Sequence, residues 1–184
     1  MTTPLRAAPT NFSALIEESA HAHGLDHRLV TAVVLVESGG NQFAWNPEPV
    51  YRYFWDVKHG RPFRAVTPDE LRSERPPADF PTLAGDPDQE WWAQQASWGL
   101  MQVMGAVARE LGFQGPYLTQ LCSAQTNLGY GCRKLNADLK WSGGDLEKAL
   151  MAYNGGRGSA VKRTALVQRY AAKVLKQLAT VTGA

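Results

Sequence analysis

Glu37 is the residue of this 184-residue chain whose position most favours acid chemistry. It follows an almost entirely apolar run over residues 29–36, so its backbone is expected to be buried. If this run is a helix, Glu37 lies in its last turn, where the helix dipole disfavours negative charge. Burial and the dipole would both raise the pKa of the carboxyl. A carboxyl protonated near neutral pH is what acid-catalysed glycosidic cleavage requires; the alternative is a helix-end glutamate that points to water.

A second block with chemical potential is Ser-Trp-Gly-Leu-Met-Gln at residues 97–102. Gly99 would allow a close approach to another stretch of backbone, because it has no side chain. The amide of Gln102 can both donate to and accept from a polar ligand. Met101 is expected by default to fill the core.

A third block, residues 149–156, ends a predicted helix with Tyr153 and Asn154 beside two glycines. A phenol and an amide at such a position can orient a sugar ring or its N-acetyl group. The alternative is a tyrosine packed in the core and an ordinary Asn-Gly helix end.

The segments around these blocks read as helices. The run after Asp26 contains many β-branched residues and could be a buried strand, but its length, its Asp cap and Gly39-Gly40 favour a helix over His27 to Ser38. Helices are also predicted before Gly24 and over 100–111, 119–139, 146–153 and 165–181. No clear strand pair is visible. The sequence therefore predicts an all-α fold.

Residues 44–90 differ from the rest, with 8 of the 11 prolines and seven aromatic residues. Only a short helix is signalled there, at Thr67-Pro68-Asp69-Glu70-Leu71. The aromatic content argues against disorder, and 47 residues are few for an independent core. We expect a single domain over 1–184 with 44–90 as an ordered insertion.

Charge is distributed unevenly along the chain. Residues 1–132 carry 9 basic and 14 acidic side chains, whereas residues 133–184 carry 10 and 3. The basic end suggests an acidic partner or simply a solvated helix face. Aromatic residues are not interleaved with these charges, which argues against nucleic-acid binding.

The blocks together resemble the lysozyme-like lytic transglycosylases, the soluble lytic transglycosylase (SLT) catalytic domain family. That family has a Glu-Ser-Gly-Gly-Asn-like stretch, then Gly-Leu-Met-Gln, Asn-x-x-x-Gly and Ala-Tyr-Asn-(Ala/Gly)-Gly. The corresponding segments here are 37–41, 99–102, 127–131 and 152–156. The resemblance extends over about 12–43 and 91–175.

The resemblance implies an α-helical, lysozyme-like domain with a sugar-binding groove, and we expect the 44–90 insertion to line one side of that groove. It makes Glu37 the single catalytic acid and base. Cleft residues would be Met101, Gln102, Tyr153 and Asn154, with Ser97 and Glu48 as further substrate-binding candidates.

The activity implied is non-hydrolytic cleavage of the MurNAc-β-1,4-GlcNAc bond of peptidoglycan. Glu37 would protonate the bridging oxygen and then accept the proton of the C6 hydroxyl of the same muramic sugar, which attacks C1. The product has a 1,6-anhydroMurNAc end. No metal or organic cofactor is implied.

The chain departs from the family pattern in three places. Ala93 stands where the family has a cleft serine, which Ser97 would have to replace. Lys134 stands where an aromatic residue commonly follows the Asn-x-x-x-Gly element, and the 44–90 insertion replaces a much shorter link. These departures concern subsite contacts rather than Glu37.

Two alternatives remain open. A hydrolytic, goose-type-like lysozyme would need a second carboxylate to activate water; Glu48 is the first choice and Asp56 the second. A wall-binding or virion structural module that has lost catalysis would have no need of Glu37.

Other signals are weak. His21, His23 and His27 do not complete a metal site, and Cys122 and Cys132 are expected to be free, buried thiols. One of Trp91 and Trp92 is expected in the core, although both could stack on sugars.

No apolar run approaches the roughly 18 residues of a membrane span, and Met1 to Asn11 lacks the apolar core of a secretion signal. We expect a monomer made in the cytoplasm that acts on peptidoglycan glycan strands. A phage endolysin released by a holin, or a virion-associated lysin, fits this combination.

Overall fold

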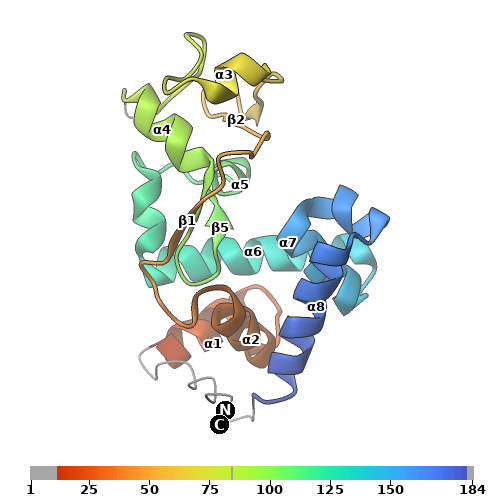
Figure 1. Cartoon of the computed structure of the whole chain (residues 1–184). Coiled ribbons are helices and arrows are strands. Elements are labelled where there is room, and N and C mark those ends of the chain that lie inside the picture. The colour runs from red at the N-terminus through yellow and green to blue at the C-terminus, as the bar shows by residue number, and fades with distance from the viewer. Residues whose placement is uncertain (1–11, 84, 182–184) are drawn as a thin grey trace, which may run out of the picture. The chain divides into compact units, whose positions relative to one another are not determined.

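The computed structural model describes residues 12–83 and 85–181 (Figure 1). The chain forms two compact units, one from residues 1–41 and 131–184 and one from residues 42–130. We call them the helical unit and the sheet unit. Residues 1–11, where no secretion signal was predicted, lie outside the described part. Among the described residues, no helix is both long and apolar enough to cross a bilayer.

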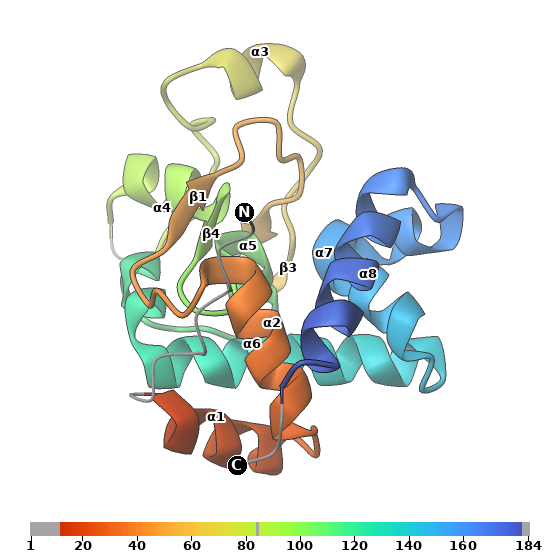
Figure 2. The same cartoon turned by 60° about the horizontal axis from the view of Figure 1, so that its bottom comes forward.

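The helical unit contains α1 (Ser13–Ala22), α2 (His27–Ser38), α7 (Leu146–Lys162), α8 (Ala165–Leu178) and the C-terminal part of α6 (Ala124–Ser142). Helix α2 packs against α1 and α8, and α8 packs against α7 (Figure 2). This arrangement brings segments that are far apart in the sequence side by side.

Helix α2 has the predicted bounds. The Asp26 side chain accepts a hydrogen bond from the Arg28 N–H at 2.8 Å and caps the helix. Gly39 ends it with a φ of 62°, a left-handed conformation that glycine adopts without a steric penalty. Six of its side chains are buried, which agrees with the apolar run: Leu29, Val30, Ala32, Val33, Val34 and Leu35.

Helix α7 is longer than predicted. Asp145 caps it as expected, through the Lys148 N–H at 3.0 Å. The helix does not stop at the glycines: Gly156 breaks its regularity with φ 78° and ψ 162°, and the chain then continues helically to Lys162. Helix α8 ends at Leu178, three residues before its predicted end.

The sheet unit corrects the expectation that no strands pair. Strands β1 (Trp45–Pro47), β4 (Ala96–Trp98) and β5 (Val103–Met104) form an antiparallel sheet in the order β1-β4-β5. Strands β2 (Trp55–Asp56) and β3 (Arg61–Pro62) form a second, two-stranded sheet. Strands of two or three residues are too short to show an alternating pattern. The fold nevertheless remains mostly helical.

The predicted helix over 100–111 was wrong in its first half, because residues 99–102 form the turn between β4 and β5. Only α5 (Gly105–Glu110) is helical there. The predicted 119–139 helix is also divided. A 3-10 helix, η2 (Leu118–Cys122), precedes α6, which then runs without interruption through Gly129 and Gly131.

The 44–90 insertion contributes to the core of the sheet unit. Helix α3 (Pro68–Arg72) has the predicted start, with a capping box between Thr67 and Glu70. The rings of Phe54 and Trp91 stack at 4.1 Å between centroids, and Phe80 packs edge-on against both. The insertion thus shares buried aromatic residues with the segment that follows it. The assignment of the whole chain to one domain stays a prediction.

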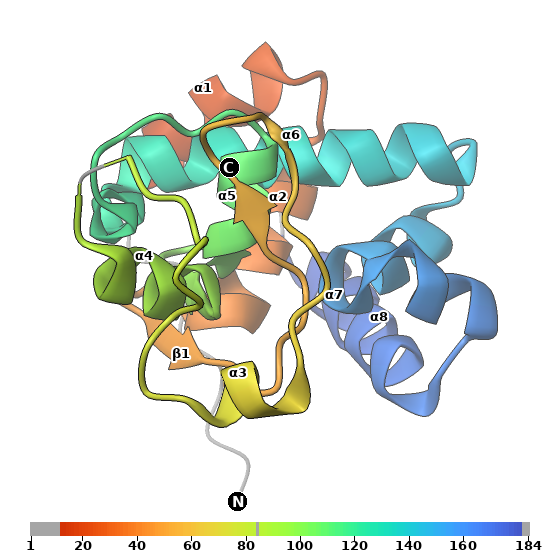
Figure 3. The same cartoon turned by 90° about the horizontal axis from the view of Figure 1, so that it is seen from above.

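A buried ion pair joins two helices of this unit, α4 (Pro87–Gln94) and α5, which pack together (Figure 3). The guanidinium of Arg109 binds both carboxylate oxygens of Glu90, at 2.8 and 2.7 Å. It also donates to the carbonyls of Phe113 and Gly115. The guanidinium and the carboxylate of this buried pair are therefore both hydrogen-bonded.

Candidate active site

Glu37 lies in the last turn of α2, as predicted, and has a partner that the sequence did not reveal. The Tyr170 hydroxyl donates a hydrogen bond to Glu37 Oε1 at 2.6 Å. Desolvation of the carboxyl raises the pKa of Glu37 from 4.5 to about 7, although the Tyr170 hydrogen bond and the charges of Lys173 and Lys134 oppose the rise. Burial therefore prevails, and a large share of the carboxyl is protonated at neutral pH.

Tyr170 reaches Glu37 because α8 packs against α2 as well as against α7. Val167, Ala171 and Val174 of α8 are buried, and Tyr170 occupies a neighbouring position on the same face. This spacing could have placed Tyr170 on the buried side of the helix. Nothing in the sequence could have identified Glu37 as its partner, since the two residues are 133 positions apart.

Tyr153 lies on α7 and is only 6% exposed. Its pKa is raised well above 10, first by desolvation and then by the negative charge of Glu37. The phenol is therefore within electrostatic range of the carboxyl. Asn154, the next residue, is exposed. The helical unit thus supplies Glu37 and the two predicted cleft residues of the third block.

Lys134 has a role that the family pattern did not suggest. Its ammonium lies 4.5 Å from the centroid of the Tyr153 ring and donates to Asp138 Oδ2 at 2.7 Å. Arg157 approaches the other oxygen of Asp138 at 3.3 Å. A cation over the ring therefore stands where the family commonly has an aromatic residue.

In the sheet unit, Gly99 is required by a close contact, as predicted. Its φ is 69°, and a Cβ atom there would lie 2.5 Å from Asn127 Nδ2 and 2.6 Å from the Leu121 carbonyl oxygen. The Asn127 amide holds this turn, because it accepts from the Met101 N–H and donates to the Trp98 carbonyl, both at 2.7 Å.

The other predicted residues of this block support the same turn. Gln102 accepts a hydrogen bond from the Ser97 hydroxyl at 2.8 Å and donates to the carbonyls of Gly99 and Ala44. The backbone φ of Gln102 is 47°, uncommon for a residue other than glycine. The Met101 side chain is fully buried, which places it in the core. Contact of these residues with substrate stays a prediction.

Glu48 and Asp56, the two candidate second carboxylates, also belong to the sheet unit. Glu48 Oε1 accepts from the Asn46 amide at 2.6 Å. Asp56 is buried and accepts from the backbone N–H groups of Lys58 and His59 and from the His59 ring. Although burial opposes it, the His59 hydrogen bonds lower the pKa of Asp56. Asp56 is therefore engaged in its own turn.

Across residues 12–83 and 85–181, no group of three or more His, Cys, Asp or Glu side chains is arranged to hold a metal ion. Cys122 and Cys132 are free; the first is partly exposed and the second is buried.

A helical scaffold that raises the pKa of one carboxyl to about 7 and bonds that carboxyl to a phenol is suited to acid-catalysed glycoside cleavage. The family model of the transglycosylase SLT domain matches residues 14–176, and the chain belongs to that family. The match confirms the resemblance seen in the four blocks.

A solved structure supports the same fold. An inactive mutant of the lytic transglycosylase Slt from Pseudomonas aeruginosa aligns with a TM-score of 0.58 and 16% sequence identity. The alignment covers 92% of this chain and 24% of that chain, so this chain spans about a quarter of the length of that protein. This likeness confirms the predicted lysozyme-like, mostly helical fold.

Proposed function

We propose that this protein is a peptidoglycan lytic transglycosylase in which Glu37 acts alone, first as the acid and then as the base. The observation that carries the proposal is the carboxyl of Glu37 in the last turn of α2, bonded to the Tyr170 hydroxyl at 2.6 Å. Burial raises the pKa of this carboxyl to about 7, which keeps both of its protonation states accessible at neutral pH. Family membership supports peptidoglycan as the substrate.

In the proposed reaction, protonated Glu37 gives its proton to the oxygen that joins MurNAc to GlcNAc, and the C1–O bond breaks. The N-acetyl carbonyl of the muramic sugar stabilises the positive charge at C1. The C6 hydroxyl of that sugar then attacks C1 and loses its proton to the Glu37 carboxylate. The acid is restored, a 1,6-anhydro ring is formed, and no water is consumed.

Tyr170 acts in this scheme as a positioning residue. Its hydrogen bond fixes one oxygen of Glu37 and favours the ionised form, which is needed in the second half of the cycle. Tyr153, within range of the charge of Glu37, is suited to orient either the carboxyl or the reacting sugar.

A hydrolytic lysozyme is the alternative, and the contacts of one candidate base weigh against it. A general base needs a carboxylate oxygen that can bind water. Asp56 already accepts three hydrogen bonds within its own turn, which weighs against it as the base. Glu48 accepts from Asn46 through Oε1 alone, so the experiment below decides on Glu48.

The proposal is tested by release of soluble muropeptides from purified peptidoglycan. Glu37→Gln should lose at least about a thousandfold in rate, because the substitute cannot transfer a proton. Asp56→Asn and Glu48→Gln neutralise the alternative bases, and their maximal rates at saturating peptidoglycan should stay within a fewfold of that of the unsubstituted enzyme. Saturation separates turnover from any effect of Glu48→Gln on substrate binding. Loss of release in either of those two variants, with folding intact, would favour hydrolysis. Release unchanged by Glu37→Gln would overturn the catalytic assignment.

The proposed place of action is the bacterial cell wall. A phage origin, release by a holin and a monomeric state stay predictions from the sequence, and so does substrate binding by Ser97, Met101, Gln102, Tyr153, Asn154 and Glu48.

A further inference from the structure

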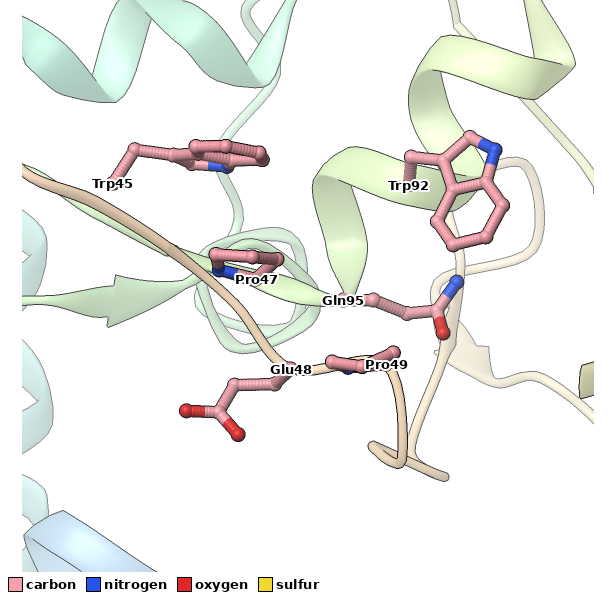
Figure 4. Close-up of a pocket in the computed structure, with 6 residues that line it drawn as sticks. All are labelled: Trp45, Pro47, Glu48, Pro49, Trp92 and Gln95. Atoms are coloured by element: carbon pink, nitrogen blue, oxygen red, sulfur yellow. The ribbon is translucent and has the colours of Figure 1, made fainter.

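The sheet unit has an aromatic pocket, formed where β1 and the loop after it meet the end of α4. Its volume is about 240 Å³, and Trp45, Pro47, Glu48, Pro49, Trp92 and Gln95 line it (Figure 4). In the figure, Trp45 and Pro47 lie on one side and Trp92 on the other, with Gln95 and Pro49 between them. Sites for drug-sized ligands usually measure roughly 300–1,000 Å³. This pocket is therefore sized for one small ring rather than for an extended ligand.

Both indoles are exposed although each is held in place. Trp45 is 57% exposed; its backbone pairs with Trp98 across β1 and β4, and the two rings pack at 6.2 Å between centroids. Trp92 is 44% exposed, and its Nε1–H donates to the Glu74 carbonyl at 3.3 Å. Rigid, exposed aromatic rings lose little conformational entropy when a ligand stacks on them.

Trp92, unlike its neighbour Trp91, is not buried in the hydrophobic core. Trp91 is fully buried and stacks on Phe54, so the helix uses one of its two consecutive tryptophans for the core. The other forms part of the pocket. Large apolar side chains that gather around an exposed hollow mark ligand sites more often than isolated ones do.

The charges of the lining restrict the ligand. Glu48 is the single charged residue among the six. Its carboxylate points away from both indoles in Figure 4 and is bonded to Asn46. None of these six described residues is a lysine or arginine, so they offer an anionic ligand no cationic side chain. The amide of Gln95 is buried and donates to the Trp91 carbonyl at 3.2 Å, so the surface offered to a ligand consists mainly of two exposed ring faces and two prolines. Such a surface suits a neutral ring with apolar C–H faces.

From this geometry we infer that the Trp45–Trp92 pocket is a carbohydrate subsite that binds one N-acetylhexosamine residue of a glycan strand by stacking on the two indoles. The choice of a glycan rests on the proposed function. The pocket would recognise the strand through residues of the sheet unit, a contribution separate from the chemistry at Glu37.

The inference is tested with ¹⁵N-labelled Glu37→Gln protein and chitotetraose, a soluble chain of N-acetylglucosamine. The indole N–H signals of Trp45 and Trp92 should shift with added sugar. Trp45→Ala and Trp92→Ala should each weaken binding about tenfold, the loss expected for one well-placed aromatic contact. Tyr117→Ala is the matched control, because Tyr117 belongs to the same unit, is also 44% exposed and does not line the pocket.

Three results would overturn the inference: no shift of the two indole signals at saturating sugar, binding unchanged in both tryptophan variants, or a shift caused by tetramethylammonium but not by chitotetraose. The indole signals are measured in the intact lining, so they remain decisive if a variant fails to fold. Turnover of peptidoglycan without indole shifts would reject the subsite and leave the proposed function standing. Indole shifts without turnover in the unsubstituted enzyme would reject the proposed function and support the subsite.

Discussion

Opposing interactions set the pKa of the Glu37 carboxyl. Desolvation favours its neutral form, whereas the Tyr170 hydroxyl and the ammonium groups of Lys173 and Lys134 favour its ionised form. Because the resulting pKa is about 7, the Glu37 carboxyl can both donate and accept a proton at neutral pH, as the proposed one-carboxyl cycle requires. This balance also gives two measurable consequences.

The first consequence concerns stability. The folded-state pKa of Glu37 is raised, so the stability it contributes is fully present below about pH 4.5 and is lost as the pH rises through about 7. Glu37→Gln removes this dependence while keeping an acceptor for Tyr170. Between pH 4.5 and 8, the free energy of unfolding of Glu37→Gln should therefore rise relative to that of the unsubstituted protein by about 3 kcal/mol. Urea titrations at the two pH values measure it; a constant difference would contradict the raised pKa.

The second consequence concerns the pH range of activity. Lys173 lowers the pKa of Glu37 through its charge, so Lys173→Met should raise that pKa further. The loss of peptidoglycan cleavage at alkaline pH should then begin at a higher pH. Lys176→Met is the matched control, because it removes an exposed charge from the same helix. An equal shift in both variants would point to net charge rather than to Lys173.

At the scale of the elements, two glycines with nearly the same φ differ in what surrounds them. Gly39 ends α2 in open space, whereas Gly99 lies against Asn127 and the Leu121 carbonyl in the turn between β4 and β5. Gly39→Ala should cost about 1–2 kcal/mol of unfolding free energy through backbone strain. Gly99→Ala should cost at least about 2 kcal/mol more, through overpacking. Equal costs, measured by chemical denaturation, would contradict the close contact.

The pair between α4 and α5 supports a further prediction. Glu90→Gln would leave the buried guanidinium of Arg109 without its countercharge and should cost about 3–5 kcal/mol of unfolding free energy. Asp69→Asn breaks an exposed pair with Arg72 and should cost less than about 1 kcal/mol. Thermal or urea unfolding measures the loss of unfolding free energy in the two variants. Similar losses would contradict the expectation that the buried pair matters more for stability than the exposed one.

How much the sequence predicts depends on how local the signal is. The bounds of α2 and the start of α3 follow from caps and glycines within a few residues. The pairing of Trp45 with Trp98 joins residues 53 positions apart through strands of three residues, and no local pattern encodes it. The same applies to the site: Glu37 was identifiable from its position at a helix end, but its bond to Tyr170 depends on how α8 packs.

At the scale of the whole molecule, the chain divides discontinuously, since the helical unit takes both ends and the sheet unit takes the middle. The long insertion lies within the sheet unit, where it supplies part of the aromatic core and the Trp45–Trp92 pocket. The proposed catalytic group and the proposed sugar subsite thus come from different units. Acid chemistry and glycan recognition can therefore be altered by separate substitutions.

Cleavage by Glu37 without water leaves a product of distinct mass, so the product itself distinguishes a transglycosylase from a hydrolase. Purified peptidoglycan is digested in H₂¹⁸O, and the released muropeptides are analysed by mass spectrometry before and after borohydride treatment. We expect 1,6-anhydroMurNAc ends that are lighter by one water, free of ¹⁸O and resistant to reduction, and we expect none of these products with Glu37→Gln. Reducible MurNAc ends that carry ¹⁸O would contradict this expectation and identify the protein as a hydrolase.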